Sequence, residues 1–168
     1  EICWSPPFLN IPFDMARGTV AMFLAEVLYR SIREEEQNRT LFSFLHNSIQ
    51  ILDDPSTDCS KFHIMFMVRL AKHLGIHPHG TWVDGNSRFD LQEGSFTRNS
   101  PVHSEYLSPE SSALLARFIE SGFDGHHQIE LTRGQKKELL QSLVTYYEIH
   151  QTHGSRIRSH EVLHEVLN

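Results

Sequence analysis

The stretch formed by residues 61–75, KFHIMFMVRLAKHLG, constrains this chain more than any other. Its apolar residues recur so densely that a helix formed by them is apolar on nearly every side, and such a helix is buried among neighbours. The segment is about 20 Å long at 1.5 Å per residue, too short to cross a bilayer. Asp58 or Ser60 is expected to cap its start, and Gly75 to end it. The stretch therefore predicts a central core helix.

The other segments predict helices around this one. Apolar residues at i, i+3 and i+4 spacing indicate helices over residues 15–36 and 40–52. In the second of these, the residues expected to face inward are Leu41, Phe42, Leu45, Ile49 and Leu52. Helix-start signals follow at Ser108-Pro109 and at the capping box Thr132 to Gln135, and Ser159 is expected to cap a last short helix.

Residues 76–107 interrupt the helical pattern. Gly, Pro, Asn and Ser are dense there, and alternating residues on either side of Gly94 predict a short β-hairpin. The predicted fold class is mostly α: a helical bundle around a buried central helix, with a small β-hairpin insert. Residues 1–14, which contain three prolines, are expected to form a packed connector, and residues 15–168 the helical domain with its insert at 76–107.

Charge and cysteine content exclude several classes of protein. The net charge of −6 disfavours a free-standing nucleic-acid binder, because affinity for phosphates depends on Lys and Arg. Two cysteines, Cys3 and Cys59, make neither a disulfide framework nor a zinc cage, so a reducing, cytoplasmic compartment is expected. No signal peptide or membrane span is recognisable.

Basic residues are relatively enriched after residue 131, where five bases face four acids. They form either a solvated surface or a contact for an acidic peptide or a DNA backbone. The candidate residues for that contact are Arg133, Lys136, Lys137, Arg156 and Arg158.

One local pattern indicates metal chemistry. His160-Glu161-Val162-Leu163-His164 matches H-E-x-x-H, in which two imidazoles on one helical face bind zinc and the glutamate acts as a general base. A zinc-dependent hydrolase would need a third protein ligand, and no clear one follows in the sequence. The alternative is a polar face on a docked terminal helix.

Several stretches in order resemble the C-terminal region of the bacterial recombination mediator RecO. FMVRLAKHLG at 66–75 is similar to that family's F-x-x-R-L-x-x-x-L-G helix, and RFDLQEGSF at 88–96 to its F-D-L-x-E-G-x-F hairpin. LSPE at 107–110 matches the helix start after that hairpin. YYEIH at 146–150 and RSHEVL at 158–163 resemble the family's ending.

This resemblance implies a binding module without catalytic residues or a cofactor. The family implies an N-terminal OB-fold domain before residues 1–14, and a helical part that contacts the acidic tail of single-stranded DNA-binding protein (SSB). It also implies partnership with RecR and, mainly through that N-terminal domain, with single-stranded DNA in RecF-pathway repair, where such a mediator aids RecA loading and strand annealing. A helical scaffold with some other protein partner remains an alternative, as does the hydrolase.

The resemblance leads to expectations about two sites, a zinc site that is absent and a binding site for the SSB tail. Many relatives carry paired zinc cysteines between the buried helix and the hairpin, but here residues 77–86 contain no cysteine, so no zinc is expected there. The SSB tail ends in a phenylalanine with acidic neighbours, and it therefore needs an apolar notch with Lys or Arg at its edge. The candidates for this edge are Lys61, Arg69 and Lys72, at the charged positions of the central helix.

Overall fold

A computed structural model of the chain describes residues 7–32, 37–83, 85–121, 128–151 and 156–167. Within these residues the chain folds into helices with one antiparallel hairpin, which confirms the predicted fold class. The elements are α1 (Met15–Ser31), α2 (Arg39–Asp53), α3 (Phe62–His73), β1 (Arg88–Asp90), β2 (Ser95–Thr97), α4 (Pro109–Glu120), α5 (Arg133–His150) and α6 (His160–Val166).

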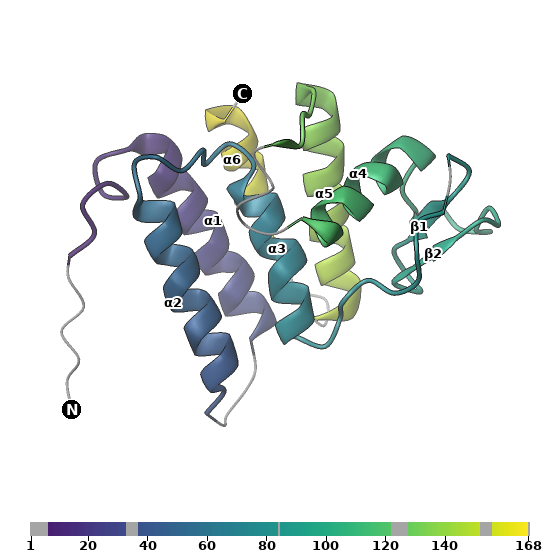
Figure 1. Ribbon diagram of the computed structural model, residues 1–168, viewed down its shortest axis with the longest axis horizontal. Coiled ribbons are helices and arrows are strands. Elements are labelled where there is room, and N and C mark those ends of the chain that lie inside the picture. Colours follow the sequence, from purple (N-terminus) through teal and green to yellow (C-terminus); the bar gives the residue numbers. More distant parts are fainter. Residues whose placement is uncertain (1–6, 33–36, 84, 122–127, 152–155, 168) are drawn as a thin grey trace.

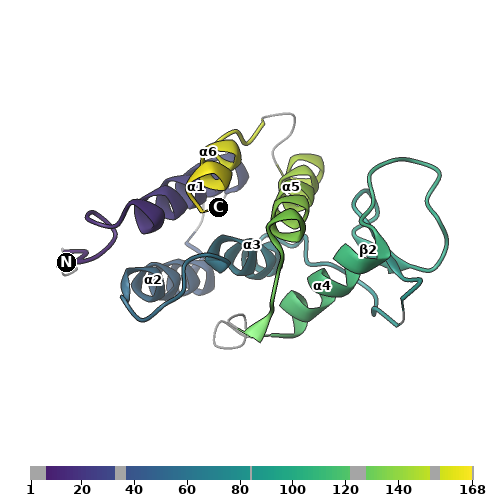
Figure 2. The same ribbon diagram turned by 90° about the horizontal axis from the view of Figure 1, so that it is seen from above.

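Helix α3 lies at the centre of the molecule, as predicted. Figures 1 and 2 show it between the α1–α2 pair on one side and α4 and α5 on the other. Nine of its twelve residues are buried. Gly75 follows its end with φ of 74°, a conformation that glycine adopts without strain. The predicted cap at its start is wrong: the Asp58 carboxylate accepts from the amide of Ser60 instead, and α3 begins without a side-chain cap.

The end of α5 holds the segment that follows α3. The Tyr146 hydroxyl donates to the Ile76 carbonyl at 2.6 Å, and the Gln151 amide donates to the Leu74 carbonyl at 2.9 Å. The buried Tyr147 hydroxyl donates to the Met67 carbonyl within α3 itself. These three bonds join α5 to the middle of α3, to its C-cap residue and to the segment beyond it, so they fix the position of α5 along α3.

The hairpin packs onto α5. Phe89 pairs with Phe96 across the strands, and the Phe89 ring lies against Tyr146 with ring centroids 5.6 Å apart. Gly94 has φ of 66°, and a Cβ atom added there would lie 2.9 Å from the Tyr146 hydroxyl. Glycine is therefore required at this turn both by backbone conformation and by close approach.

Two predicted details of the first helices are corrected. Helix α1 ends at Ser31 rather than continuing to residue 36, because Ile32 is already extended; residues 33–36 lie outside the described part of the chain. Phe42, predicted to face inward, is 70% exposed. The four apolar residues at 41, 42, 44 and 45 span too wide an arc for one buried face. Leu41 and Leu52 are buried as predicted, and Leu45 and Ile49 are partly buried against the core.

Two carboxylates join distant segments. Asp53 at the end of α2 accepts from the amides of Leu9, Asn10 and Ile11, so the described part of the predicted connector lies against α2. Glu26 of α1 accepts from the amides of Arg158 and Ser159 and from the Ser159 hydroxyl. Ser159 was expected to cap α6 with its own side chain; Glu26 binds this helix start instead.

The caps predicted for α4 and α5 are confirmed. Ser108 accepts from the amide of Ser111, and Thr132 and Gln135 form a reciprocal capping box. No described helix is long and apolar enough to cross a membrane. The molecule therefore has two ends, the α1–α2 end and the hairpin end, which lie on opposite sides of α3 in both views.

Candidate functional site: an apolar groove between α1 and α2

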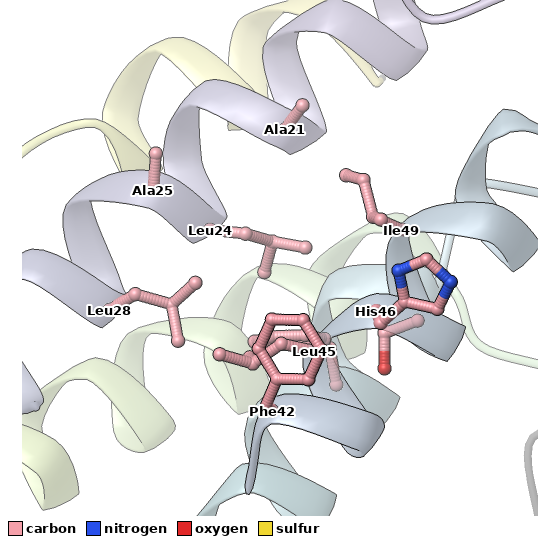
Figure 3. A pocket seen from close by; sticks show the side chains of 10 residues that line it. Ala21, Leu24, Ala25, Leu28, Phe42, Leu45, His46 and Ile49 are labelled. Atoms are coloured by element: carbon pink, nitrogen blue, oxygen red, sulfur yellow. The ribbon is translucent and has the colours of Figure 1, made fainter. Parts of the chain in front are cut away.

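An open groove of about 340 Å³ lies between α1 and α2. Figure 3 shows Leu24 and Leu28 of α1 directed toward Phe42 and Leu45 of α2 across this space. The full lining is Ala21, Leu24, Ala25, Leu28, Phe42, Leu45, His46, Ser48, Ile49 and Phe66. Its surface is thus almost entirely apolar, and it can accept an apolar side chain.

The groove exists because α1 presents small side chains to α2. Ala21 and Ala25 lie one turn apart on the same face of α1 and fill little of the space between the helices. Phe66 of α3, 2% exposed, belongs to the core beneath. The Phe42 ring stacks with His46 at a centroid distance of 6.2 Å, so the exposed phenylalanine stands at the rim rather than inside the core.

One end of the groove is polar. A second pocket, lined by Gln37, Asn38, Arg39 and Phe42, shares Phe42 with it. Arg39 is exposed at the first position of α2. An apolar groove whose one end adjoins an arginine combines the two features that an acidic peptide ending in an aromatic residue requires.

The residues predicted to bind the SSB tail lie elsewhere. Lys61, Arg69 and Lys72 belong to α3 or its first cap position, and none of the three lines the groove. The Lys61 ammonium donates to the Ile129 carbonyl at 3.1 Å and lies 4.0 Å from the Asp58 carboxylate. Lys61 therefore already holds a loop in place, whereas Lys72 is exposed and Arg69 is half-buried.

The five basic candidates for an anionic partner flank α6. Arg133, Lys136 and Lys137 belong to the first turns of α5, and Arg156 and Arg158 precede α6. Lys136 donates to the Leu167 carbonyl at 2.9 Å, and burial lowers the pKa of its ammonium group. Lys136 thus fixes the end of α6, while the other four side chains are exposed.

The H-E-x-x-H segment forms α6. His160 and His164 are half-buried and Glu161 is exposed. Desolvation and the nearby cations Lys137, Arg133 and Lys136 lower the pKa of His164. Among the described residues, no group of three His, Cys, Asp or Glu side chains is placed to hold a metal ion. The part of the chain that the structure describes supplies no third ligand for this motif.

His63 of α3 is a buried group that the sequence did not single out. It is 1% exposed, its Nδ1 has no hydrogen-bond partner, and it borders Lys136 and His164 beneath α6. Burial, and secondarily Lys136, lower the pKa of His63 to about 3. The imidazole is therefore neutral at physiological pH and packs as an apolar ring against Phe23.

No local sequence pattern indicates the groove directly. The signal that could have indicated it was the surplus of apolar residues in α2, set against the alanines of α1. Arg39 carries no signal by itself, since an exposed arginine at a helix start is common.

Comparisons with known proteins agree with the resemblance seen in the sequence. The family model described as "Recombination protein O C terminal" matches residues 12–158. A relative named DNA repair protein RecO from Bacteroides fragilis is 33% identical over 163 residues, covering 96% of this chain and 67% of its own length. A protein of the same name from Flavobacterium johnsoniae is 32% identical and covers 100% of this chain and 69% of its own length. None of the solved structures is a significant match.

The family model thus covers most of the helical domain, including the hairpin and the groove. The two relatives align with nearly all of this chain at an identity that shows family membership, and this chain spans about two thirds of their length. The chain belongs to the RecO family of DNA repair proteins.

Proposed function

We propose that this chain is the helical part of a non-enzymatic recombination mediator of the RecF-pathway type. In this role it binds the SSB tail, RecR and single-stranded DNA, and it aids RecA loading and strand annealing in the cytoplasm without a cofactor. Membership in a family of DNA repair proteins supports the general role. The metal-dependent hydrolase through His160, Glu161 and His164 is not favoured, because no described third ligand accompanies these residues.

The observation that carries the proposal is the groove between α1 and α2 with Arg39 beyond its rim. A terminal phenylalanine buried there removes apolar area from water, at about 25 cal/mol per Å². Arg39 is a donor for the carboxylates that surround such a phenylalanine, through charge-assisted hydrogen bonds. Phe42 offers an aromatic face at the rim, which favours an aromatic ligand.

The α3 candidates give a second position for the tail. Arg69 and Lys72 offer charge at the end of the central helix, and Lys61 at its start. Among the described residues, the pockets at the α1–α2 groove, at the start of α2, beneath α6 and in the hairpin insert are not lined by Lys61, Arg69 or Lys72, which makes the α1–α2 groove the stronger proposal. Arg133, Lys137, Arg156 and Arg158 remain proposed contacts for an anionic partner such as DNA.

A labelled SSB-tail peptide, with and without its terminal phenylalanine, tests the proposal by fluorescence anisotropy. We expect binding that requires the phenylalanine and weakens with salt. Ala25→Phe fills the groove from an exposed position and is expected to weaken binding at least about tenfold, or about 1.4 kcal/mol. Arg39→Gln is expected to weaken it several-fold.

Met22→Phe is the matched control. Met22 is 74% exposed on the same helix and does not line the groove, so this variant should bind as the unchanged chain does. Loss of binding in Arg69→Ala with full binding in Ala25→Phe would move the site to α3. No binding to the unchanged chain at about 100 μM peptide, a free energy weaker than about −5.5 kcal/mol, would refute the tail proposal.

A further inference from the structure

The stretch formed by residues 59–83 contains no aspartate or glutamate, although the whole chain carries 21 acids against 15 bases. Its basic residues are Lys61, Arg69 and Lys72, and it also contains four histidines. Nine of the twelve residues of α3 are buried, and the three that are not, Arg69, Lys72 and His73, all lie in its second half. Basic side chains are therefore concentrated where α3 ends and the chain turns toward the hairpin (Figure 1).

The backbone brings a histidine to this end of α3. Arg69 and Lys72 are three positions apart, so they share one face of the helix. After the glycine that ends α3 the chain turns back, and the amide of Ile76 donates to the carbonyl of Ala71 at 3.0 Å. This bond places the next residue, His77, beside the last turn of the helix.

His77 lies among basic groups rather than carboxylates. Desolvation lowers the pKa of its imidazole, and three neighbours lower it further: Lys72, His79 and Arg69. The ring is half-buried, and its buried Nδ1 has no hydrogen-bond partner among the described residues. Tyr146 of α5, whose hydroxyl bonds the preceding residue, stays neutral because burial raises its pKa to about 12. The environment of His77 thus lacks a negative charge that would stabilise its protonated form.

The two cations beside His77 are available to a ligand. Lys72 is exposed and Arg69 is half-buried, and within the described part of the chain neither side chain forms a hydrogen bond or an ion pair. Lys61, at the other end of α3, instead bonds the Ile129 carbonyl. Neither Arg69 nor Lys72 lines a described pocket, so the cluster offers charge without an apolar cavity. Such a surface suits phosphate groups better than a peptide that needs an apolar anchor.

We infer that Arg69, Lys72 and His77 bind phosphate groups of a single-stranded DNA backbone. A guanidinium group can bind phosphate oxygens bidentately, an ammonium group adds a compact charge, and a protonated imidazole donates from both nitrogens. A phosphate placed among these side chains relieves their mutual repulsion. The choice of DNA rests on the proposed function in a family of DNA repair proteins.

Binding at this site takes up a proton at His77. In the free chain the imidazole is neutral near pH 7.5, because its pKa lies below 6.5. Phosphate oxygens favour the charged form, so the affinity for DNA rises as the pH falls. Arginine and lysine side chains titrate far above this range, and their contribution to binding is therefore the same at both ends of it.

The first test measures binding of a labelled oligothymidine to the chain by anisotropy over a range of salt concentrations. Arg69→Gln is compared with Arg117→Gln, which removes the same charge from an exposed position on α4. We expect Arg69→Gln to weaken binding several-fold at low salt and Arg117→Gln to leave it nearly unchanged. The double variant Arg69→Gln/Lys72→Gln should lower the steepness of log K against log salt by about 1.4, as expected for two lost phosphate contacts.

The same measurement at about pH 6.0 and pH 7.5 isolates His77. The unchanged chain should bind several-fold more tightly at the lower pH. His77→Gln, which keeps a hydrogen-bond donor but does not titrate, should lose most of this gain, and Arg117→Gln should keep it. An equal gain in His77→Gln and in the unchanged chain would remove His77 from the site.

Three outcomes overturn the inference: equal weakening by Arg69→Gln and Arg117→Gln, an unchanged salt dependence in the double variant, or no binding to the unchanged chain at the lowest salt. If inorganic phosphate binds the unchanged chain but oligothymidine does not, the ligand is a free anion and the DNA site is refuted. Circular dichroism and thermal unfolding confirm that the variants are folded.

The SSB-tail peptide, measured on the same variants, separates this inference from the proposed function. Retained peptide binding in the double variant, together with weakened DNA binding, supports two separate sites. Loss of peptide binding with unchanged DNA binding assigns the cluster to the acidic peptide and refutes the phosphate site. A peptide that binds neither the unchanged chain nor the variants refutes only the tail proposal.

Discussion

The α1–α2 end and the hairpin end use their aromatic residues in opposite ways. At the α1–α2 end, Phe42 is 70% exposed at the rim of an apolar groove. At the hairpin end, Phe89 is 1% exposed and packs against Phe96 and Tyr146, while polar side chains line an open cavity of the insert. The first end has more apolar surface than its two helices bury; the second uses its central aromatic residue to attach the insert.

This difference shows at which end of the molecule apolar side chains remain available to a ligand. A short two-stranded hairpin is not stable by itself, so its central aromatic side chain packs against α5 and is not available to a ligand. Two long helices that already pack on α3 can leave an apolar groove open without losing their fold. The groove end is thus suited to an apolar anchor, whereas the aromatic residues of the insert serve to hold it in place.

The comparison is tested most strongly by truncating one phenylalanine at each end. Phe89→Ala removes a fully buried ring and is expected to lower the free energy of unfolding by about 3–4 kcal/mol. Phe42→Ala, at an exposed position, should change it by less than about 0.5 kcal/mol while weakening tail-peptide binding. Urea unfolding measures both. Similar losses of stability in the two variants would mean that the groove end is part of the folded core.

The attachment of the insert is tested at Gly94. Gly94→Ala places a side chain at positive φ and against the Tyr146 hydroxyl, which donates to Ile76. Backbone strain and a weakened hydrogen bond together are expected to destabilise the fold by about 2–3 kcal/mol. Gly85→Ala is the control in the same insert, since an added Cβ there meets nothing within 4 Å. If both variants unfold at the same urea concentration, the insert is not held in the way described.

Helix α3, which lies between the two ends, is tested through the pH dependence of the free energy of unfolding. Because burial lowers the pKa of His63 to about 3 from 6.5, the unfolded chain binds more protons than the folded chain between these values. The contribution of His63 to stability is therefore fully present above pH 6.5 and is lost as the pH falls toward 3. Between pH 7.5 and 5.0 the free energy of unfolding should fall by about 2 kcal/mol from this residue alone.

His63→Leu should remove most of that fall, because the buried position then no longer titrates. His79→Leu, at an exposed site, should leave the pH dependence as it is. The titratable groups that border His63 are Lys136 and Lys137 of α5 and His164 of α6, and the charge of Lys136 disfavours a positive charge on His63. An unchanged pH dependence in His63→Leu would assign the acid sensitivity to other groups.

Much of the fold could be predicted because its signals are local. The apolar run at 61–75, the Ser108 cap, the Thr132–Gln135 capping box and the glycine at the hairpin turn each depend on residues within a few positions of one another. The end of α1 and the orientation of Phe42 could not be predicted in this way. Both depend on which face of a helix meets its neighbours, and periodicity alone does not fix that face.

The sequence by itself determined the helices, the buried centre and the place of the hairpin, since helix periodicity and turn chemistry act over a few residues. Only the tertiary structure decided the sites. The groove needs the alanines of α1 opposite the aromatic rim of α2, and the start of α6 needs Glu26, which lies 133 residues before Ser159. Contacts between residues so far apart are set by how the whole bundle packs, and no local pattern in the sequence specifies them.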